Sequence, residues 1–121
     1  MERERLEEIW DRDGACNRLL NDEDLLQKML VMFLQTAKQA LADIEAATAQ
    51  HDLFTVKALA HKLKGSASAV GALKIIEDAL NIETAAGNDD INQIEINIGR
   101  LNSDMAEVQL AMTNYLREAT S

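Results

Sequence analysis

The most regular pattern in this chain is INQIEINIGRLNSDMAEVQLAMTNY, residues 91–115. Its apolar residues recur every three or four positions without a gap: Ile91, Ile94, Ile98, Leu101, Met105, Val108, Met112 and Tyr115. A heptad-like stripe of this kind suits packing against other helices. The pattern therefore predicts a long helix that belongs to a helical bundle.

A second long helix is predicted to begin after Asn21, which we expect to cap it. Acidic residues follow at positions 22–24, where the positive end of a helix dipole favours them. Its apolar positions are again three or four residues apart: Leu26, Met29, Leu30, Phe33, Ala37, Ala40, Leu41 and Ile44. This spacing predicts an amphipathic helix with one buried side.

Two shorter helices are expected between these long ones. Asp52 is the predicted cap of the first, whose buried positions are Leu53, Val56, Ala60, Leu63, Ala67 and Val70. Gly71 marks a break before the second, in which the apolar series is Leu73, Ile76, Ala79 and Leu80. Gly87 and the polar residues after it predict a helix stop, a turn and a new cap.

Short connections make consecutive helices antiparallel, so the sequence predicts an all-α fold, an antiparallel up-down-up-down four-helix bundle. An extra N-terminal helical segment is expected before it, in which Asp13 caps a short helix with the apolar residues Ala15, Cys16, Leu19 and Leu20. We expect one domain over residues 1–121, with residues 1–10 as an N-terminal extension and about residues 11–118 as the bundle.

The composition narrows the class of protein. The chain has 121 residues, no proline and 3% aromatic residues, which favours one helical domain. Its single cysteine excludes an internal disulfide and fits a reducing compartment. No long apolar run or signal-peptide pattern is present, so we expect a cytoplasmic protein. A formal net charge of −9 disfavours nucleic acid and anionic membranes as partners.

The sequence AHKLKGS, residues 60–66, carries the strongest functional signal. A glycine inside a helix costs about 1 kcal/mol relative to alanine, so Gly65 implies that something approaches the backbone there. His61 lies one turn before Gly65 and therefore on the same side of the helix. The same side carries two lysines and a serine, namely Lys57, Lys64 and Ser68. We interpret His61 as the acceptor of a phosphoryl group, with Lys57, Gly65 and Ser68 as the docking positions for the protein that delivers it.

The charge around His61 supports this interpretation. No Asp or Glu occurs from Leu53 to Ile76, whereas four lysines do: Lys57, Lys62, Lys64 and Lys74. A cationic segment in an acidic domain attracts an acidic partner or a phosphate. Lys64 has the reach to contact phosphoryl oxygens and to compensate the charge that develops during transfer.

Histidine acts as a covalent carrier when one ring nitrogen is fixed by an acceptor and the other is open. Glu83 continues the series Leu73, Ile76 and Leu80, at a position where an apolar residue was expected. An acid at the edge of a buried stripe tends to have a partner, because an unpaired buried carboxylate is costly. We predict that Glu83 accepts the Nδ1 proton of His61; the alternative is a solvated surface acid.

Residues 60–72, AHKLKGSASAVGA, resemble the signature of the histidine-containing phosphotransfer (HPt) domains of bacterial phosphorelays. The resemblance extends more weakly to residues 21–26 and Phe33. It implies that His61 is the phosphoacceptor, that Lys64 assists the phosphoryl group and that Gly65 keeps the docking surface open. The Glu or Gln that is bonded to the imidazole in several members falls on Glu83.

The resemblance also implies partners. The domain is expected to accept a phosphoryl group from an aspartate of one response-regulator receiver domain and to pass it to another. A hybrid sensor histidine kinase is a further partner class. No cofactor is expected on the domain, because the resemblance places the required Mg²⁺ on the receiver. We expect a monomer without nucleic acid or direct membrane contact.

A dimerisation-and-phosphoacceptor domain of a histidine kinase is the nearest alternative. Such domains have an acid directly after the histidine and a proline four or five residues later. Here Lys62 follows His61, and the chain contains no proline. There is also no glycine-rich nucleotide-binding segment, so we expect a phosphocarrier without a kinase or ATP site rather than an enzyme.

Two further alternatives were weighed. A metal site is not expected, because His51 and His61 lie ten residues apart on roughly perpendicular faces and Cys16 is in another segment. The last alternative is a non-catalytic helical bundle that serves as an interaction module for a partner helix.

Overall fold

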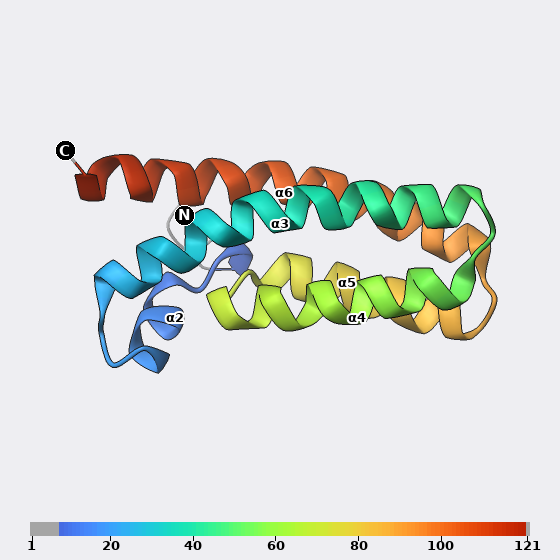
Figure 1. Cartoon of the computed structure of the whole chain (residues 1–121), viewed down its shortest axis with the longest axis horizontal. Coiled ribbons are helices and arrows are strands. Elements are labelled where there is room, and N and C mark those ends of the chain that lie inside the picture. The colour runs from blue at the N-terminus through green and yellow to red at the C-terminus, as the bar shows by residue number, and fades with distance from the viewer. Residues whose placement is uncertain (1–7, 121) are drawn as a thin grey trace.

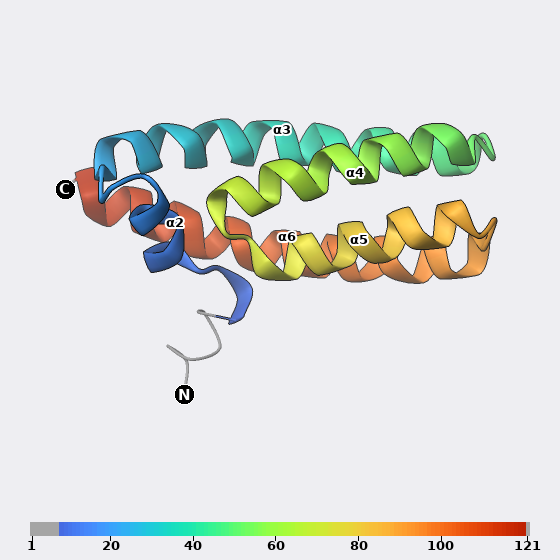
Figure 2. The same ribbon diagram turned by 90° about the horizontal axis from the view of Figure 1, so that it is seen from below.

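The computed structural model describes residues 8–120, which form an all-α bundle (Figure 1). The short helix α2 precedes four long helices: α2 Arg12–Arg18, α3 Glu23–Ala49, α4 Leu53–Val70, α5 Leu73–Gly87 and α6 Ile91–Thr120. Figures 1 and 2 together show that α3 to α6 run up, down, up and down, each beside the next, with α6 returning beside α3. The expected fold class is therefore confirmed.

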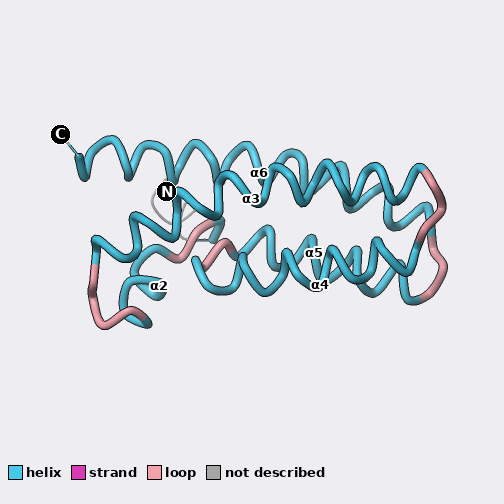
Figure 3. The backbone as a smooth tube through the Cα atoms, in the orientation of Figure 1, coloured by secondary structure: helices cyan, strands magenta, loops and turns pink. Residues whose placement is uncertain are grey.

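The connections between the helices are short, as the tube in Figure 3 shows. Helices α3 and α6 span 27 and 30 residues, whereas α4 and α5 span only 18 and 15. The two long helices therefore extend past the α4–α5 corner, and α2 lies beside that corner (Figure 2). The N-terminal extension expected over residues 1–10 falls mostly outside the described residues, which begin at Glu8.

The apolar stripe of α6 faces the core as its spacing predicts. Its fully or almost fully buried members are Ile94, Leu101, Met105, Val108 and Met112. A buried asparagine, Asn97, interrupts this side of the helix. Its Nδ2 donates to the carbonyl oxygen of Gln93, while its Oδ1 has no hydrogen-bond partner among the described residues.

Two of the predicted helix caps were wrong by one or two residues. The cap of α3 is Asp22, whose side chain accepts from the backbone N–H of Leu25. Asn21 has a φ of +61°, so it lies in the left-handed region, which a capping residue does not adopt. The cap of α2 is Asp11 rather than Asp13. Asp52 caps α4 as predicted.

The buried side of α5 differs from the predicted one. Leu73 and Leu80 are 41% and 45% exposed, and Ile76 is half-buried. Of the predicted series only Ala79 is buried, and the full set of buried residues is Ile75, Asp78, Ala79, Ile82, Ala85 and Ala86. Because α5 packs against both α4 and α6, its buried side points between these two helices. The other three members of the predicted series lie along the rim of that side, and Glu83 continues them there.

The N-terminal segment is attached to the corner between α4 and α5. The Nε1–H of Trp10 donates to the carbonyl oxygen of Val70 at 2.8 Å. The backbone N–H of Asp11 donates to the carbonyl oxygen of Gly71, also at 2.8 Å. Gly71 has a φ of +74°, and a Cβ there would lie 2.7 Å from the Asp11 carbonyl oxygen. Glycine is therefore required at this corner. Ile9 and Trp10, in the expected N-terminal extension, are buried.

Candidate functional site

Helix α4 places His61 at the edge of the core. Val56, Ala60 and Leu63 hold the helix against its neighbours and are almost completely buried. His61 follows Ala60 by one residue, so it is turned by about 100° from the buried stripe. Its side chain is 68% exposed. The imidazole is thus fixed by a rigid helix and remains open to solvent on one side.

The carboxylate of Glu83 on α5 bridges two side chains of α4. Its Oε2 lies 2.7 Å from Nδ1 of His61, and its Oε1 accepts a hydrogen bond from Nζ of Lys64 at 2.6 Å. The Glu83 side chain is only 16% exposed. The hydrogen bond from Lys64, followed by that from His61, lowers the pKa of Glu83 although burial acts in the opposite direction. Glu83 therefore stays ionised at neutral pH.

This arrangement selects the state of the imidazole. An ionised carboxylate only accepts hydrogen bonds, so the Nδ1 of His61 must carry the proton that is shared with Glu83. In the neutral ring the lone pair is then on Nε2. The contact expected between Glu83 and His61 is present, although the series from which it was predicted marks the rim of α5 rather than its buried side.

Lys64 has a partner that sequence reasoning missed. Lys64 was expected to contact phosphoryl oxygens; in the structure its Nζ is bonded to Glu83 and its side chain is 28% exposed. A signal was available, because Lys64 lies three residues after His61 on the same side of α4 and a carboxylate has two oxygens to share. Lys64, Glu83 and His61 thus form one hydrogen-bonded cluster.

The three predicted docking positions have different surroundings. A Cβ at Gly65 would meet no atom of the described residues within 4 Å outside its own stretch of helix, so no packing contact among them requires a glycine there. Ser68 is exposed, and its Oγ donates to the carbonyl oxygen of Lys64. Lys57 is exposed, and its Nζ lies within 4 Å of where a Cβ at Gly87 would be, at the end of α5.

A large apolar side chain on the same side of α4 was overlooked. Phe54 is 86% exposed and lies seven residues before His61, which is two helical turns. Its signal in the sequence is an aromatic residue that directly follows Leu53 and falls outside the buried stripe. We call Phe54, Gly65 and Ser68, together with the exposed side of His61, the docking surface.

The histidine and cysteine weighed for a metal site are far from this cluster in the fold. His51 lies in the α3–α4 turn with a φ of +55°, and Cys16 lies in α2. Among residues 8–120, no group of three or more His, Cys, Asp or Glu side chains is arranged to hold a metal ion. No helix in the described part of the chain has the length and apolarity to cross a membrane.

Comparison with known proteins gives a family match and similar solved structures, two of which are described below. The family model of the Hpt domain matches residues 28–117, a range that includes His61, Lys64 and Glu83. No curated protein sequence matches the chain. The structure of histidine-containing phosphotransfer protein B (HptB) from Pseudomonas aeruginosa PAO1 is similar, with a TM-score of 0.85 and 19% identity over 91% of this chain and 96% of that one.

The HPT domain of an Hpt sensor hybrid histidine kinase from Shewanella is also similar. Its TM-score is 0.80 and its identity 22%, and the match covers 92% of this chain and 96% of that domain. At these identities the two structures establish a shared fold.

Proposed function

Because this chain belongs to the Hpt domain family and so has a histidine phosphotransfer role in phosphorelays, we propose that it carries a phosphoryl group on His61 between two receiver domains. The donor is an aspartyl phosphate of one response regulator, and the acceptor is an aspartate of another. The observation that carries this proposal is the 2.7 Å contact between Nδ1 of His61 and Glu83 on an otherwise exposed ring.

The transfer follows from the state of the ring. The Nε2 lone pair of His61 attacks the phosphorus of the aspartyl phosphate, a bond from nitrogen to phosphorus forms, and the bond from phosphorus to the donor carboxylate breaks. The positive charge that develops on the ring is balanced by the carboxylate of Glu83, which continues to accept the hydrogen bond from the protonated Nδ1. In the second step the carboxylate of the next receiver attacks phosphorus, and Nε2 regains its lone pair.

Lys64 supplies a cation beside the reacting group, because its Nζ is bonded to the carboxylate that holds His61. An ammonium has three donors, and one of them is bonded to Glu83, so the others can bind phosphoryl oxygens without breaking that contact. The Mg²⁺ of the reaction belongs to the receiver in this proposal, and the domain itself provides no kinase or ATP site. We place the domain in the cytoplasm as a monomer, where receivers and a hybrid sensor kinase are its partners.

A small phosphodonor tests the chemistry without a known partner. Incubation with phosphoramidate should produce a label that is labile in acid and stable in base, and that mass spectrometry locates on His61. Addition of a receiver domain with Mg²⁺ should then remove the label. A chain that takes up no label from phosphoramidate or from phosphorylated receivers would instead be an interaction module.

Gly65→Gln is expected to stabilise the domain and to slow its phosphorylation by a receiver. Gln is a better helix former by roughly 0.5 kcal/mol, which raises the melting temperature by about 2 °C. Its side chain also occupies the surface beside His61 to which the receiver binds. Gly99→Gln is the matched control, because a Cβ at Gly99 also meets no atom within 4 Å. Both variants should gain stability, and only Gly65→Gln should transfer slowly. Equal transfer rates would show that Gly65 is not a docking position.

Phe54→Ala is expected to raise the KM for a phosphorylated receiver by about tenfold while leaving the rate with phosphoramidate unchanged. An exposed aromatic residue that becomes buried in an interface contributes more than about 1 kcal/mol. Leu110→Ala is the control, since Leu110 is 64% exposed on α6 and lies outside the docking surface. The KM is measured in steady-state transfer assays. An unchanged KM for Phe54→Ala would show that Phe54 does not belong to the docking surface.

A further inference from the structure

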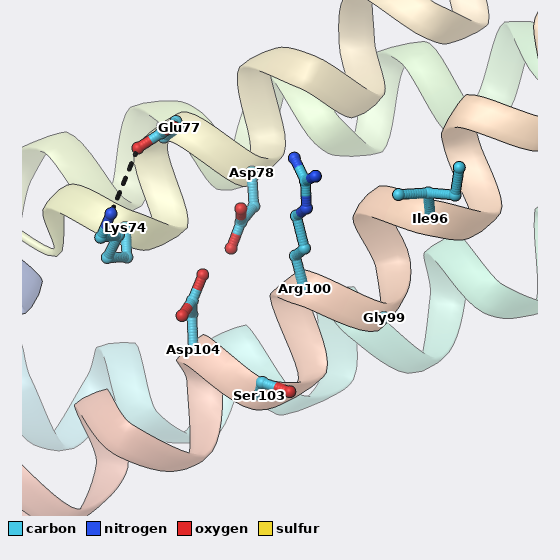
Figure 4. Close-up of a pocket in the computed structure, with 8 residues that line it drawn as sticks. All are labelled: Lys74, Glu77, Asp78, Ile96, Gly99, Arg100, Ser103 and Asp104. Atoms are coloured by element: carbon cyan, nitrogen blue, oxygen red, sulfur yellow. Dashed lines mark ion pairs between the residues drawn. The ribbon is translucent and has the colours of Figure 1, made fainter.

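Two aspartates face one another between α5 and α6, away from the histidine cluster. Asp78 of α5 and Asp104 of α6 line a pocket of about 580 Å³, and their carboxyl groups point toward each other in Figure 4. Asp78 is only 3% exposed, although its side chain is ionisable. Charged side chains are almost never buried to this extent without a partner.

Within residues 8–120, no cationic side chain forms an ion pair with Asp78. Its Oδ2 has no hydrogen-bond partner among the described residues. The charged residues around it are Lys74 and Glu77 of its own helix and Arg100 and Asp104 of α6, while α3 and α4 contribute none to the pocket. Lys74 is paired with Glu77 at 3.8 Å (Figure 4). Of these charged neighbours, the carboxyl group of Asp104 affects the pKa of Asp78 most.

We propose that Asp78 and Asp104 share one proton, and that the loss of this proton as the pH rises weakens the packing of α5 against α6. A protonated Asp78 donates a hydrogen bond to Asp104, whereas two ionised carboxylates at this place repel one another inside a poorly solvated interface. The pair is therefore a pH-sensitive contact between the helix that carries Glu83 and its neighbour.

The direction of the pKa shift agrees with this geometry. Burial, followed by the hydrogen bond and the charge of Asp104, raises the pKa of Asp78 to about 8, with a smaller contribution from Glu77 and an opposing one from Lys74. A carboxyl whose pKa is raised by folding binds its proton more tightly in the folded state. The contribution of Asp78 to stability is therefore greatest below the ordinary pKa near 3.8 and is lost as the pH rises to about 8.

A proton fits this site better than a metal ion. Only two carboxylates converge, no described third acid, histidine or cysteine completes a metal-binding group, and two cationic side chains line the same pocket. Asp78 lies about 7.5 Å along α5 from Glu83, given the rise of about 1.5 Å per residue. Loosening of α5 at high pH would therefore act on the helix that positions the Nδ1 acceptor of His61.

Thermal melting of the whole chain between pH 5 and pH 8.5 tests the proposal. The wild-type melting temperature should fall by roughly 5 °C or more over this range. Asp78→Asn and Asp104→Asn should reduce this fall and melt above the wild type at pH 8.5. Glu77→Gln is the control, because its exposed carboxyl contributes less, and it should keep the wild-type dependence. A fall of the same size in all four proteins would overturn the proposal.

Carbon-13 NMR of the aspartate carboxyl groups provides a test that needs no variant. One aspartate of the wild type should titrate near pH 8, and its signal should be lost in Asp78→Asn. If every aspartate titrates below pH 5, the pair does not share a proton. Addition of MgCl2 at pH 8.5 should leave the melting temperature unchanged, and a rise that Asp78→Asn abolishes would assign the site to a cation instead.

Discussion

His61→Gln should abolish labelling by phosphoramidate and by any phosphorylated receiver, while the domain stays folded. The proposed reaction forms its only new covalent bond at Nε2 of this ring, and an amide nitrogen does not replace it as a nucleophile. The side chain is 68% exposed, so its replacement removes little packing and the melting temperature should change by only a few degrees. Label incorporation, measured beside thermal melting, separates lost chemistry from lost structure.

His51→Gln is the matched control, because it removes the other histidine of the chain. His51 lies in the turn between α3 and α4, and its replacement should leave the extent of labelling unchanged. Label that persists in His61→Gln but disappears in His51→Gln would show that His51 is the phosphoacceptor. Label that persists in both single variants would locate the acceptor on another residue type, and its stability in acid and base would identify the chemistry.

Glu83→Ala should slow phosphorylation of His61 by roughly 10- to 100-fold, because it removes a charged hydrogen-bond acceptor that contributes about 1.5–3 kcal/mol. The ring then loses the partner that holds its proton on Nδ1, so nitrogen-15 NMR should show a mixture of tautomers. Glu77→Ala, which removes an exposed acid of the same helix, should change neither the rate nor the tautomer ratio.

Lys64 and Glu83 are expected to act together. Lys64→Ala removes both a cation near the phosphoryl group and the strongest hydrogen bond to Glu83, so the two single variants share one lost interaction. In a double-mutant cycle the Lys64→Ala/Glu83→Ala protein should therefore lose less than the product of the single effects. If the loss of rate in the double variant equals the product of the two single losses, each residue acts on His61 independently.

The sequence alone predicted those helices and helix ends that depend on a local residue pattern. Stripes with a period of three to four residues predicted α3, α4 and α6, and Asp52 and Gly71 marked two helix boundaries. The cap of α3 was misplaced because the choice between Asn21 and Asp22 depends on backbone angles in the preceding turn, and several residues there are equally good caps.

The buried side of α5 was predicted incorrectly because it depends on the two helices that pack against α5. Helices α4 and α6 both pack on it, so its buried side is broad, and Leu73 and Leu80 fall at the rim although they are apolar. Side chains that meet between helices depend on the register of two elements, which no local pattern encodes. This is why the bond from Lys64 to Glu83 and the approach of Asp78 to Asp104 emerged only with the structure.

The attachment of the N-terminal segment also gives the molecule a local fluorescence probe. Trp10 is the single tryptophan of the chain, its indole is 6% exposed, and its N–H is bonded to the last carbonyl of α4. Intrinsic fluorescence therefore reports on one corner of the bundle, whereas circular dichroism sums over all the helices. Comparing the two signals during denaturation shows whether this corner opens as a separate unit or together with the rest.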